Sequence, residues 1–219
     1  MNKLIIFGTG DIAQLANYYF GIDSDYEVVA FTVDDEYNKC NELEGRPVVS
    51  FENIENNYPP EEYKMFVALS YAQMNKLREK KYFEAKNKGY ELVSYVSSKC
   101  SYVSQFSHGD NCFILEDNTI QPFVKMGNNI TLWSGNHIGH HSVINDHNFI
   151  SSHVVISGHC VIDSNCFLGV NSTIGHMVTI AKETLLGAGS TVSKNTDSKG
   201  IYVPARTVKL DKNSDEIKL

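Results

Sequence analysis

The chain has 219 residues, of which 42% are hydrophobic and 21% are charged, and its formal net charge is −7 at pH 7. This length supports one large or two small domains with a sizeable core, and the acidic balance excludes the basic footprint of a nucleic-acid-binding protein. The sequence shows neither an apolar run of membrane-spanning length nor a signal peptide, so a cytoplasmic protein is expected. The five cysteines include no C-x-x-C pair, and we expect reduced thiols.

The first ninety-odd residues alternate between strand-like and helix-like patterns. Strands are expected at Lys3–Phe7, Tyr26–Thr32, Arg46–Val49, Met65–Leu69 and Tyr90–Tyr95, and helices at Ile12–Phe20 and Ala72–Lys88. A strand, a glycine turn, a helix and a second strand in this order are typical of a Rossmann unit. We therefore expect residues 1–97 to form a small α/β, Rossmann-like domain.

Two features of this domain are typical of nucleotide binding. Gly8, Thr9 and Gly10 form a strand-to-helix turn, where backbone N–H groups can approach a phosphate or a ribose. Asp34 and Asp35 end the second strand, where such folds hydrogen-bond a ribose or a base edge. A plain tight turn and a solvated acidic pair are the alternative interpretations. Too little chain follows for the second half of a dinucleotide site, so the pattern predicts a single nucleotide.

The second half of the chain carries an aliphatic residue at every sixth position. A helix requires a period near 3.6 and a half-buried strand a period of 2, so neither explains the pattern. A solenoid of short strands with three hexapeptides per coil does. Cys160 and Cys166 occupy the small-residue position two places before an aliphatic, which indicates structural packing. The series is Ile114, Ile120, Met126, Leu132, Ile138, Ile144, Ile150, Ile156, Ile162, Leu168, Ile174, Ile180, Leu186 and Val192.

This repeat resembles the left-handed parallel β-helix of bacterial hexapeptide acyltransferases. The resemblance covers about the second half of the chain and implies the left-handed sense, which the spacing alone does not give. It also implies a homotrimer that places active sites at the seams between subunits. We expect the β-helix over residues 98–206 and a carboxy-terminal tail over residues 207–219.

The two domains together resemble a narrower group. A Rossmann-like domain with G-x-G and a strand-ending Asp-Asp, joined to a hexapeptide β-helix, is similar to the sialic acid O-acetyltransferase family. That family includes the nucleotide-sugar N-acetyltransferases of the bacillosamine and viosamine pathways. The resemblance implies transfer of acetyl from acetyl-CoA to a UDP- or dTDP-linked 4-amino-4,6-dideoxy sugar, in the synthesis of surface polysaccharides or related glycans. It implies a nucleotide in the first domain and acetyl-CoA on the β-helix.

All eight histidines lie in the second half of the chain. Four repeat every six residues, namely His141, His147, His153 and His159. We interpret this spacing as an outward corner position, with surface decoration expected above all for His147 and His159. His140 differs, because it follows an inward aliphatic by two residues, where the family resemblance places the catalytic base. Imidazole has an unperturbed pKa near 6.5, which suits proton removal at neutral pH. His141 stands where many relatives have a carboxylate.

The resemblance implies roles for four further residues. The backbone N–H of Gly158 would stabilise the oxyanion and contact acetyl-CoA, and backbone groups near Val170 and Ala188 would line the pantetheine channel. Trp133 replaces an asparagine that touches the sugar in some relatives; it can stack on a sugar or base, or pack at an interface. A thioester is already activated, so direct transfer without a covalent enzyme intermediate is expected, and no metal.

Three alternatives stay open. A sugar O-acetyltransferase of the sialic acid type would use the same fold, base and donor with a hydroxyl acceptor. A trimeric zinc carbonic anhydrase also has a hexapeptide β-helix, but it normally needs an H-x-x-x-x-H pair, and no two histidines here are five residues apart. A non-catalytic trimer that only binds a nucleotide sugar would leave His140 idle. Release of CoA from acetyl-CoA in the presence of amino or hydroxyl sugars distinguishes these cases.

Overall fold

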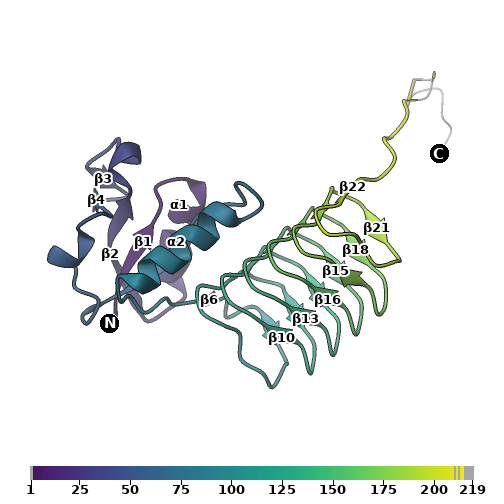
Figure 1. Ribbon diagram of the computed structural model, residues 1–219, viewed down its shortest axis with the longest axis horizontal. Coiled ribbons are helices and arrows are strands. Elements are labelled where there is room, and N and C mark those ends of the chain that lie inside the picture. The colour runs from purple at the N-terminus through teal and green to yellow at the C-terminus, as the bar shows by residue number, and fades with distance from the viewer. Residues whose placement is uncertain (1, 210, 212, 215–219) are drawn as a thin grey trace.

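The computed structural model describes residues 2–209, 211, 213 and 214. An α/β part built on a five-stranded sheet comes first, and a stack of coils made of short parallel strands follows (Figure 1). The α/β part lies beside the first coils, and the last coils extend away from it. Among the described residues, no helix combines the length and the apolar character that crossing a membrane requires.

The amino-terminal sheet has the strand order β3-β4-β2-β1-β5. Its strands are parallel except for β3, which pairs antiparallel with β4 at the edge. The strand order reverses at β1, and in such sheets a ligand binds outside the carboxyl ends of the strands at the reversal. The bounds are β1 (Asn2–Phe7), α1 (Asp11–Ile22), β2 (Tyr26–Val33), η1 (Asp35–Tyr37), β3 (Glu42–Leu43), β4 (Arg46–Ser50), η2 (Ile54–Asn56), β5 (Tyr63–Val67) and α2 (Lys76–Asn87).

The two helices cover opposite faces of this sheet. Successive residues of a strand point to opposite faces, and β1 is apolar on both. Leu4 and Ile6 pack in the cluster that contains the buried residues of α1, whereas Ile5 and Phe7 pack in the cluster that contains those of α2. The sheet is therefore the middle layer of an α/β sandwich, as the Rossmann-like pattern predicts.

Two expected elements differ from the structure. The helix expected from residue 72 begins at Lys76, because Gln73, Met74 and Asn75 adopt left-handed φ angles of 54°, 54° and 64° that an α-helix does not allow. The strand expected at Tyr90–Tyr95 is not continuous. It contributes a single bridge to the sheet, and the chain then passes into the first strand of the coils.

The coils form a parallel β-helix with three flat sheets, in which each strand pairs with the strand 18 residues later. Face 1 contains β6 (Tyr95–Val96), β8 (Phe113–Ile114), β11 (Thr131–Leu132), β14 (Phe149–Ile150), β17 (Phe167–Leu168), β20 (Leu185–Leu186) and β22 (Ile201–Tyr202). Face 2 contains β7 (Ser101–Tyr102), β9 (Thr119–Ile120), β12 (His137–Ile138), β15 (Val155–Ile156), β18 (Thr173–Ile174) and β21 (Thr191–Val192). Face 3 contains β10 (Lys125–Met126), β13 (Val143–Ile144), β16 (Val161–Ile162) and β19 (Thr179–Ile180).

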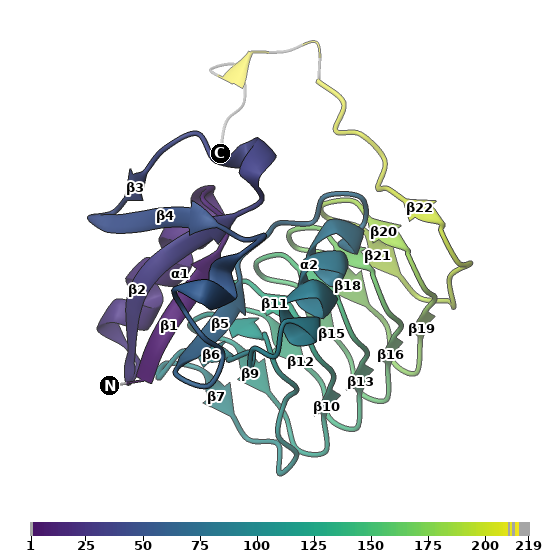
Figure 2. The same ribbon diagram turned by 60° about the vertical axis from the view of Figure 1, so that its left-hand side comes forward.

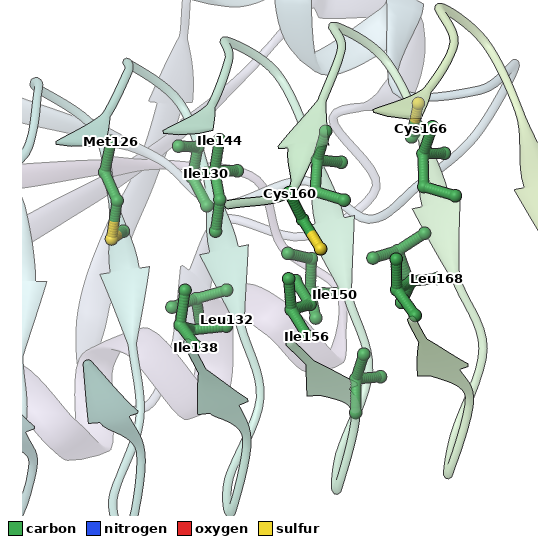
Figure 3. Packing of buried hydrophobic residues seen from close by; sticks show 14 of the residues in the cluster. Met126, Ile130, Leu132, Ile138, Ile144, Ile150, Ile156, Cys160, Cys166 and Leu168 are labelled. Carbon is green, nitrogen blue, oxygen red and sulfur yellow. The ribbon is translucent and has the colours of Figure 1, made fainter. Parts of the chain in front are cut away.

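The inside of the coils is filled by the hexapeptide aliphatics. All fourteen belong to one core cluster, and the most exposed of them, Val192, is only 8% exposed. The aliphatics of neighbouring coils stack on one another, with the thiols of Cys160 and Cys166 among them (Figure 3). Burial raises the pKa of the Cys166 thiol to about 12. All five cysteines are free, so the structural interpretation of Cys160 and Cys166 is confirmed.

The chain turns at three kinds of corner. We call the turn from face 1 to face 2 the first corner, that from face 2 to face 3 the second corner, and that from face 3 to face 1 the third corner. Each turn contains one residue with a left-handed φ, a conformation in which Asn, Asp and His are enriched among non-glycine residues. These residues are Asn111, Asp117, Phe123, Asn129, Gly135, His141, His147, His153, His159, Asn165, Asn171, Met177, Glu183 and Gly189.

The coils extend beyond the aliphatic series at both ends. β6 and β7 precede Ile114, and β22 follows Val192 and pairs with β20. Because β6 already pairs with β8, regular coil structure begins before residue 98; the division into residues 1–97 and 98–206 stays a prediction. Residues 203–209 carry no helix or strand, and the end of the expected tail, 207–219, lies partly outside the described residues.

The α/β part covers face 1 and the third corner. Helix α2 runs along the stack (Figure 2), with Lys76 Nζ 2.9 Å from Glu183 Oε2 near one end and Lys86 Nζ 2.6 Å from Asp110 Oδ2 near the other. Between them Arg78 is 2% exposed, and burial lowers its pKa to about 10, so it stays charged at neutral pH. The second corner joins the two other faces and therefore lies on the opposite side of the coil.

Candidate functional site

A cavity of about 240 Å³ lies at the carboxyl ends of β1 and β2. It brings together four of the residues predicted to bind the substrate, Gly8, Thr9, Gly10 and Asp34. We call it the sheet cavity. Its position beside the reversal of the strand order is where doubly wound folds bind ligands. Its other lining residues are Phe7, Val33, Tyr37, Leu69, Leu77 and Lys81.

The two glycines of the turn have different reasons to be glycine. Gly8 has φ of 121°, and a Cβ there would lie 2.7 Å from the carbonyl oxygen of Ala68, so only glycine fits the turn. Gly10 has an ordinary φ of −85° and precedes α1, and a Cβ there would meet nothing within 4 Å. The open space at Gly10 therefore lies next to the N–H groups of a helix amino terminus, which attract anions.

The two aspartates of the predicted pair point to different places. Asp34 Oδ1 lies 2.6 Å from Nζ of Lys81, a side chain that is 8% exposed. Burial by itself would lower the pKa of Lys81, but its hydrogen bonds to Asp34 and Glu84 raise it above the usual value. Asp35 is exposed and donates its backbone N–H to the Glu52 carboxylate at 3.1 Å. It does not line the sheet cavity, so only Asp34 joins the glycine turn.

A second cavity, of about 390 Å³, adjoins the sheet cavity. Gly10 and Leu69 line both, and Trp133 closes the second one from the first corner of the β-helix. The sequence analysis missed Tyr71, which is 51% exposed, lines this cavity and packs 5.0 Å from the Phe149 ring. It follows β5 closely, and its position beyond the carboxyl end of a central strand was the available signal. The other lining residues are Asp11, Ile12, Leu15, Ala68 and Ser70.

His140 lies at the second corner within a group of imidazoles. Its Nδ1 is 3.0 Å from Nδ1 of His141, so one nitrogen donates and the other accepts, and its backbone N–H donates to Gln121 Oε1 at 2.9 Å. The ring of His159 stacks on that of His141 at 4.7 Å, and His176 lies edge-on to His159 at 5.5 Å. The sequence analysis missed this grouping, although His141 and His159 are 18 residues apart and so occupy the same position in adjacent coils.

Gly158 lies directly beneath the ring of His140. A Cβ at Gly158 would come within 2.8 Å of Cε1 and Nε2 of that ring, so a glycine lets the imidazole lie against the backbone. Within residues 2–209, the N–H of Gly158 donates to no protein acceptor, whereas that of His159 donates to His140 at 2.9 Å. An imidazole and an unpaired backbone donor therefore lie side by side, which is the pairing that the catalytic prediction requires.

The two residues predicted to line a pantetheine channel lie elsewhere on the same chain. Val170 and Ala188 are exposed at the first corner, in adjacent coils, and their N–H groups have no acceptor within residues 2–209. The backbone approaches closely there, because a Cβ at Gly169 would lie 2.6 Å from the nitrogen of Ala188. Face 2 separates both residues from His140 and Gly158, so one chain does not bring the four together.

The interpretation of His147 as surface decoration is wrong. This side chain is 5% exposed, because the third corner lies beneath α2, and its ring packs against those of Tyr82 and Phe83. Burial lowers its pKa, partly offset by the Glu79 carboxylate 3.7 Å from Nε2. Its Nδ1 is 2.9 Å from Nδ2 of Asn129 and accepts that N–H. The same spacing thus places a histidine outside at the second corner and inside at the third.

The sheet cavity and His140 do not meet within one chain. Trp133, at the edge of the cavities, lies on the first corner, and His140 lies on the second corner of the same coil. The strand β12 of face 2 runs between them, so both lie at a similar height along the stack. A molecule held by the cavities reaches an imidazole at that height only if another copy of the chain supplies it.

Comparison with solved structures identifies proteins of the same fold. The acetyltransferase domain of PglB from Neisseria gonorrhoeae matches with a TM-score of 0.79 and 17% identity, over 93% of this chain and 97% of that one. PerB from Caulobacter crescentus, in complex with CoA and GDP-perosamine, matches with a TM-score of 0.79 and 21% identity, over 93% and 95%. WeeI from Acinetobacter baumannii matches with a TM-score of 0.78 and 18% identity, over 92% and 96%.

These similarities concern the fold, because every identity is below 25%. No protein-family model matches the chain, and neither does any curated protein. The strand topology and the solved neighbours together confirm the expected architecture, a small Rossmann-like part followed by a left-handed parallel β-helix. The roles of individual residues follow from the geometry of this chain.

Proposed function

We propose that the protein transfers an acetyl group from acetyl-CoA to the amino group of a nucleotide-linked sugar. The observation that carries this proposal is the His140 ring lying against Gly158, whose N–H has no protein acceptor within residues 2–209. A general base and an oxyanion donor side by side are the two groups that acyl transfer needs. Fold neighbours that are acetyltransferases, one of them in complex with CoA and GDP-perosamine, support the choice of donor and acceptor.

The reaction is a direct transfer. The acceptor nitrogen attacks the thioester carbonyl, a C–N bond forms, and the proton of the amine passes to Nε2 of His140. The N–H of Gly158 stabilises the negative charge that develops on the carbonyl oxygen. The C–S bond then breaks, and CoA leaves as a thiolate that takes up a proton. No cysteine takes part, which agrees with the burial of Cys112, Cys160 and Cys166.

His141 orients the base. It replaces the carboxylate that many relatives carry at this position, and its Nδ1 faces Nδ1 of His140 at 3.0 Å. When His140 donates through Nδ1, its Nε2 is unprotonated and faces the backbone at Gly158. A neutral imidazole holds this tautomer without the charge that a carboxylate would add, so His141 is a positioning residue in this proposal.

The nucleotide occupies the sheet cavity and the sugar the adjoining one. The N–H groups at the start of α1 attract the phosphates at the open space beside Gly10, and the Asp34–Lys81 pair supplies an acceptor and a cation at the cavity wall. Trp133 and Tyr71 offer aromatic faces to the sugar. UDP or dTDP is the expected carrier, and a neighbour that binds GDP-perosamine adds GDP to the carriers worth testing.

The active site is completed in a homotrimer. When face 2 of each chain faces a threefold axis, the first corner of one chain meets the second corner of the next. That seam joins Trp133, Val170 and Ala188 of one chain to His140 and Gly158 of its neighbour at similar heights. The outward residues of face 2 suit such burial because none is an acid, a lysine or an arginine; they are Ser101, Thr119, His137, Val155, Thr173 and Thr191.

The test is an acceptor panel with acetyl-CoA. UDP-, dTDP- and GDP-linked 4-amino-4,6-dideoxy sugars are compared with the matched nucleotide sugars that carry a hydroxyl in place of the amine. We expect an amine acceptor to release CoA and to gain the mass of one acetyl group, and the matched hydroxyl to give no product. Product from the hydroxyl alone would make the protein an O-acetyltransferase. Binding of a nucleotide sugar without any CoA release would leave a non-catalytic binding protein.

A further inference from the structure

The second corner carries more imidazole than one general base needs. The ring nitrogens of His140, His141 and His159 all lie within 4.8 Å of one another, and all three side chains are exposed. Within the described residues, no carboxylate forms an ion pair with any of them. Three unshielded histidines with converging nitrogens are a typical ligand set for a borderline transition-metal cation.

Local backbone geometry brings the three rings together. His140 and His141 are neighbours in sequence, yet the φ of 59° at His141 turns the chain so that their Nδ1 atoms face each other. His159 occupies the same turn position one coil later, also with φ of 59°, and its ring lies parallel to that of His141 within 11°. Gly158 lacks the side chain that would push the His140 ring away from this pair.

We propose that His140, His141 and His159 form a site for one divalent transition-metal ion, with Zn²⁺ as the reference ion. Tetrahedral Zn²⁺ binds imidazole nitrogen at about 2.0–2.1 Å, which places the nitrogens of two ligands about 3.4 Å apart. His140 and His141 already have nitrogens at 3.0 Å, and the exposed rings close the remaining gap by rotating about their side-chain bonds. The fourth position faces solvent and is left to water.

Metal at this site would inhibit the enzyme. This part of the inference rests on the proposed function, because a metal held by His140 occupies the imidazole that must accept the proton. The metal is therefore an inhibitor that competes with general-base catalysis, and removal of metal by a chelator leaves an active enzyme. Binding itself depends only on the three histidines and is measured without any substrate.

The binding experiment uses the full chain, purified without a polyhistidine tag, and titrates Zn²⁺ by calorimetry and Co²⁺ by its visible absorption. We expect one ion per chain, with the absorption of four-coordinate Co²⁺. His159→Asn should weaken binding at least tenfold. His153→Asn is the matched control, because His153 is an exposed histidine with the same left-handed turn conformation at the first corner, away from the three ligands. This control should bind as the wild type does.

The outcomes separate the two parts. The metal site is overturned if the wild type shows no saturable binding, or if His159→Asn binds as tightly as His153→Asn. In the activity arm, Zn²⁺ should inhibit the wild type and a chelator should restore it, while His159→Asn resists the same Zn²⁺ concentration at least tenfold better. Binding without inhibition would overturn the inhibitory role alone. Absence of acetyl transfer with every acceptor would contradict the proposed function and leave the calorimetric result on the metal intact.

Discussion

At the scale of single residues, the glycine turn separates a folding requirement from a binding requirement. Gly8 has φ of 121° and no room for a Cβ, because the carbonyl of Ala68 lies 2.7 Å from its ideal position. Gly10 has an ordinary φ and open space around the same ideal position. A methyl group at Gly8 would therefore disturb the protein, whereas one at Gly10 would occupy volume that the proposal gives to the nucleotide phosphates.

We expect Gly8→Ala and Gly10→Ala to have opposite profiles. Gly8→Ala should destabilise the protein by about 1–3 kcal/mol or more, the range for a residue forced into a glycine-only conformation. Gly10→Ala should leave the thermal midpoint within about a degree or two, since surface changes of this kind fall within roughly 0.5 kcal/mol, and should raise KM for the nucleotide sugar but not for acetyl-CoA. Thermal unfolding and steady-state kinetics measure both. An unchanged KM for Gly10→Ala would place the phosphates elsewhere.

At the scale of elements, the corner turns decide what a histidine does. His147 and His159 share the turn position and the left-handed φ, but α2 covers the third corner and leaves the second open. His147 is consequently a buried neutral ring that accepts a hydrogen bond from Asn129. Burial lowers its pKa below the ordinary 6.5. The unfolded chain then binds a proton near pH 6 that the folded chain does not.

His147 should therefore make the protein less stable in mild acid. Its contribution is complete above about pH 6.5 and is lost as the pH falls toward its lower folded-state pKa, because protons favour the unfolded chain over that range. We expect the thermal midpoint of the wild type to fall more steeply between pH 7 and pH 5.5 than that of His147→Asn. His153→Asn, which changes an exposed histidine, should follow the wild type. Parallel curves for all three proteins would show that His147 does not titrate on unfolding.

Elements differ in how well the sequence predicts them. The coil strands are predictable because each inward aliphatic is set by a local six-residue period that the register of 18 repeats faithfully. The start of α2 is not, because the left-handed run at Gln73, Met74 and Asn75 contains no glycine or proline to signal it. The buried side chain of Asn75, which bonds to the carbonyl of Cys166 at 2.9 Å, is a long-range contact that holds this turn.

The candidate site was predictable to the extent that its residues act locally. The glycine turn, Asp34 and His140 follow from motifs, and the structure places them in a cavity and at an open corner. Whether a given histidine is buried depends on which corner the helix covers, and this requires the packing of two parts far apart in sequence. The grouping of His140 with His159 requires the stacking of adjacent coils in addition to the turn itself.

At the scale of the whole molecule, the separation of the cavities from His140 predicts the assembly. We expect a homotrimer in solution, with face 2 toward the threefold axis. Val155→Glu should break it, because three carboxylates would meet near the axis without a counter-charge. Val161→Glu, the matched change on face 3, should leave it intact. Light scattering at equal protein concentration measures the mass. A trimer that survives Val155→Glu, or a fully active monomer, would contradict this arrangement.

The most direct test of the central claim is the kcat of His140→Ala, measured by CoA release with an amine acceptor that the wild type uses. We expect kcat to fall by about two to four orders of magnitude, the usual contribution of a positioned general base, while the trimer and acetyl-CoA binding persist. A rise in pH should partly restore the rate, because more of the amine is then free of its proton. A His140→Ala protein with kcat near that of the wild type would contradict the account.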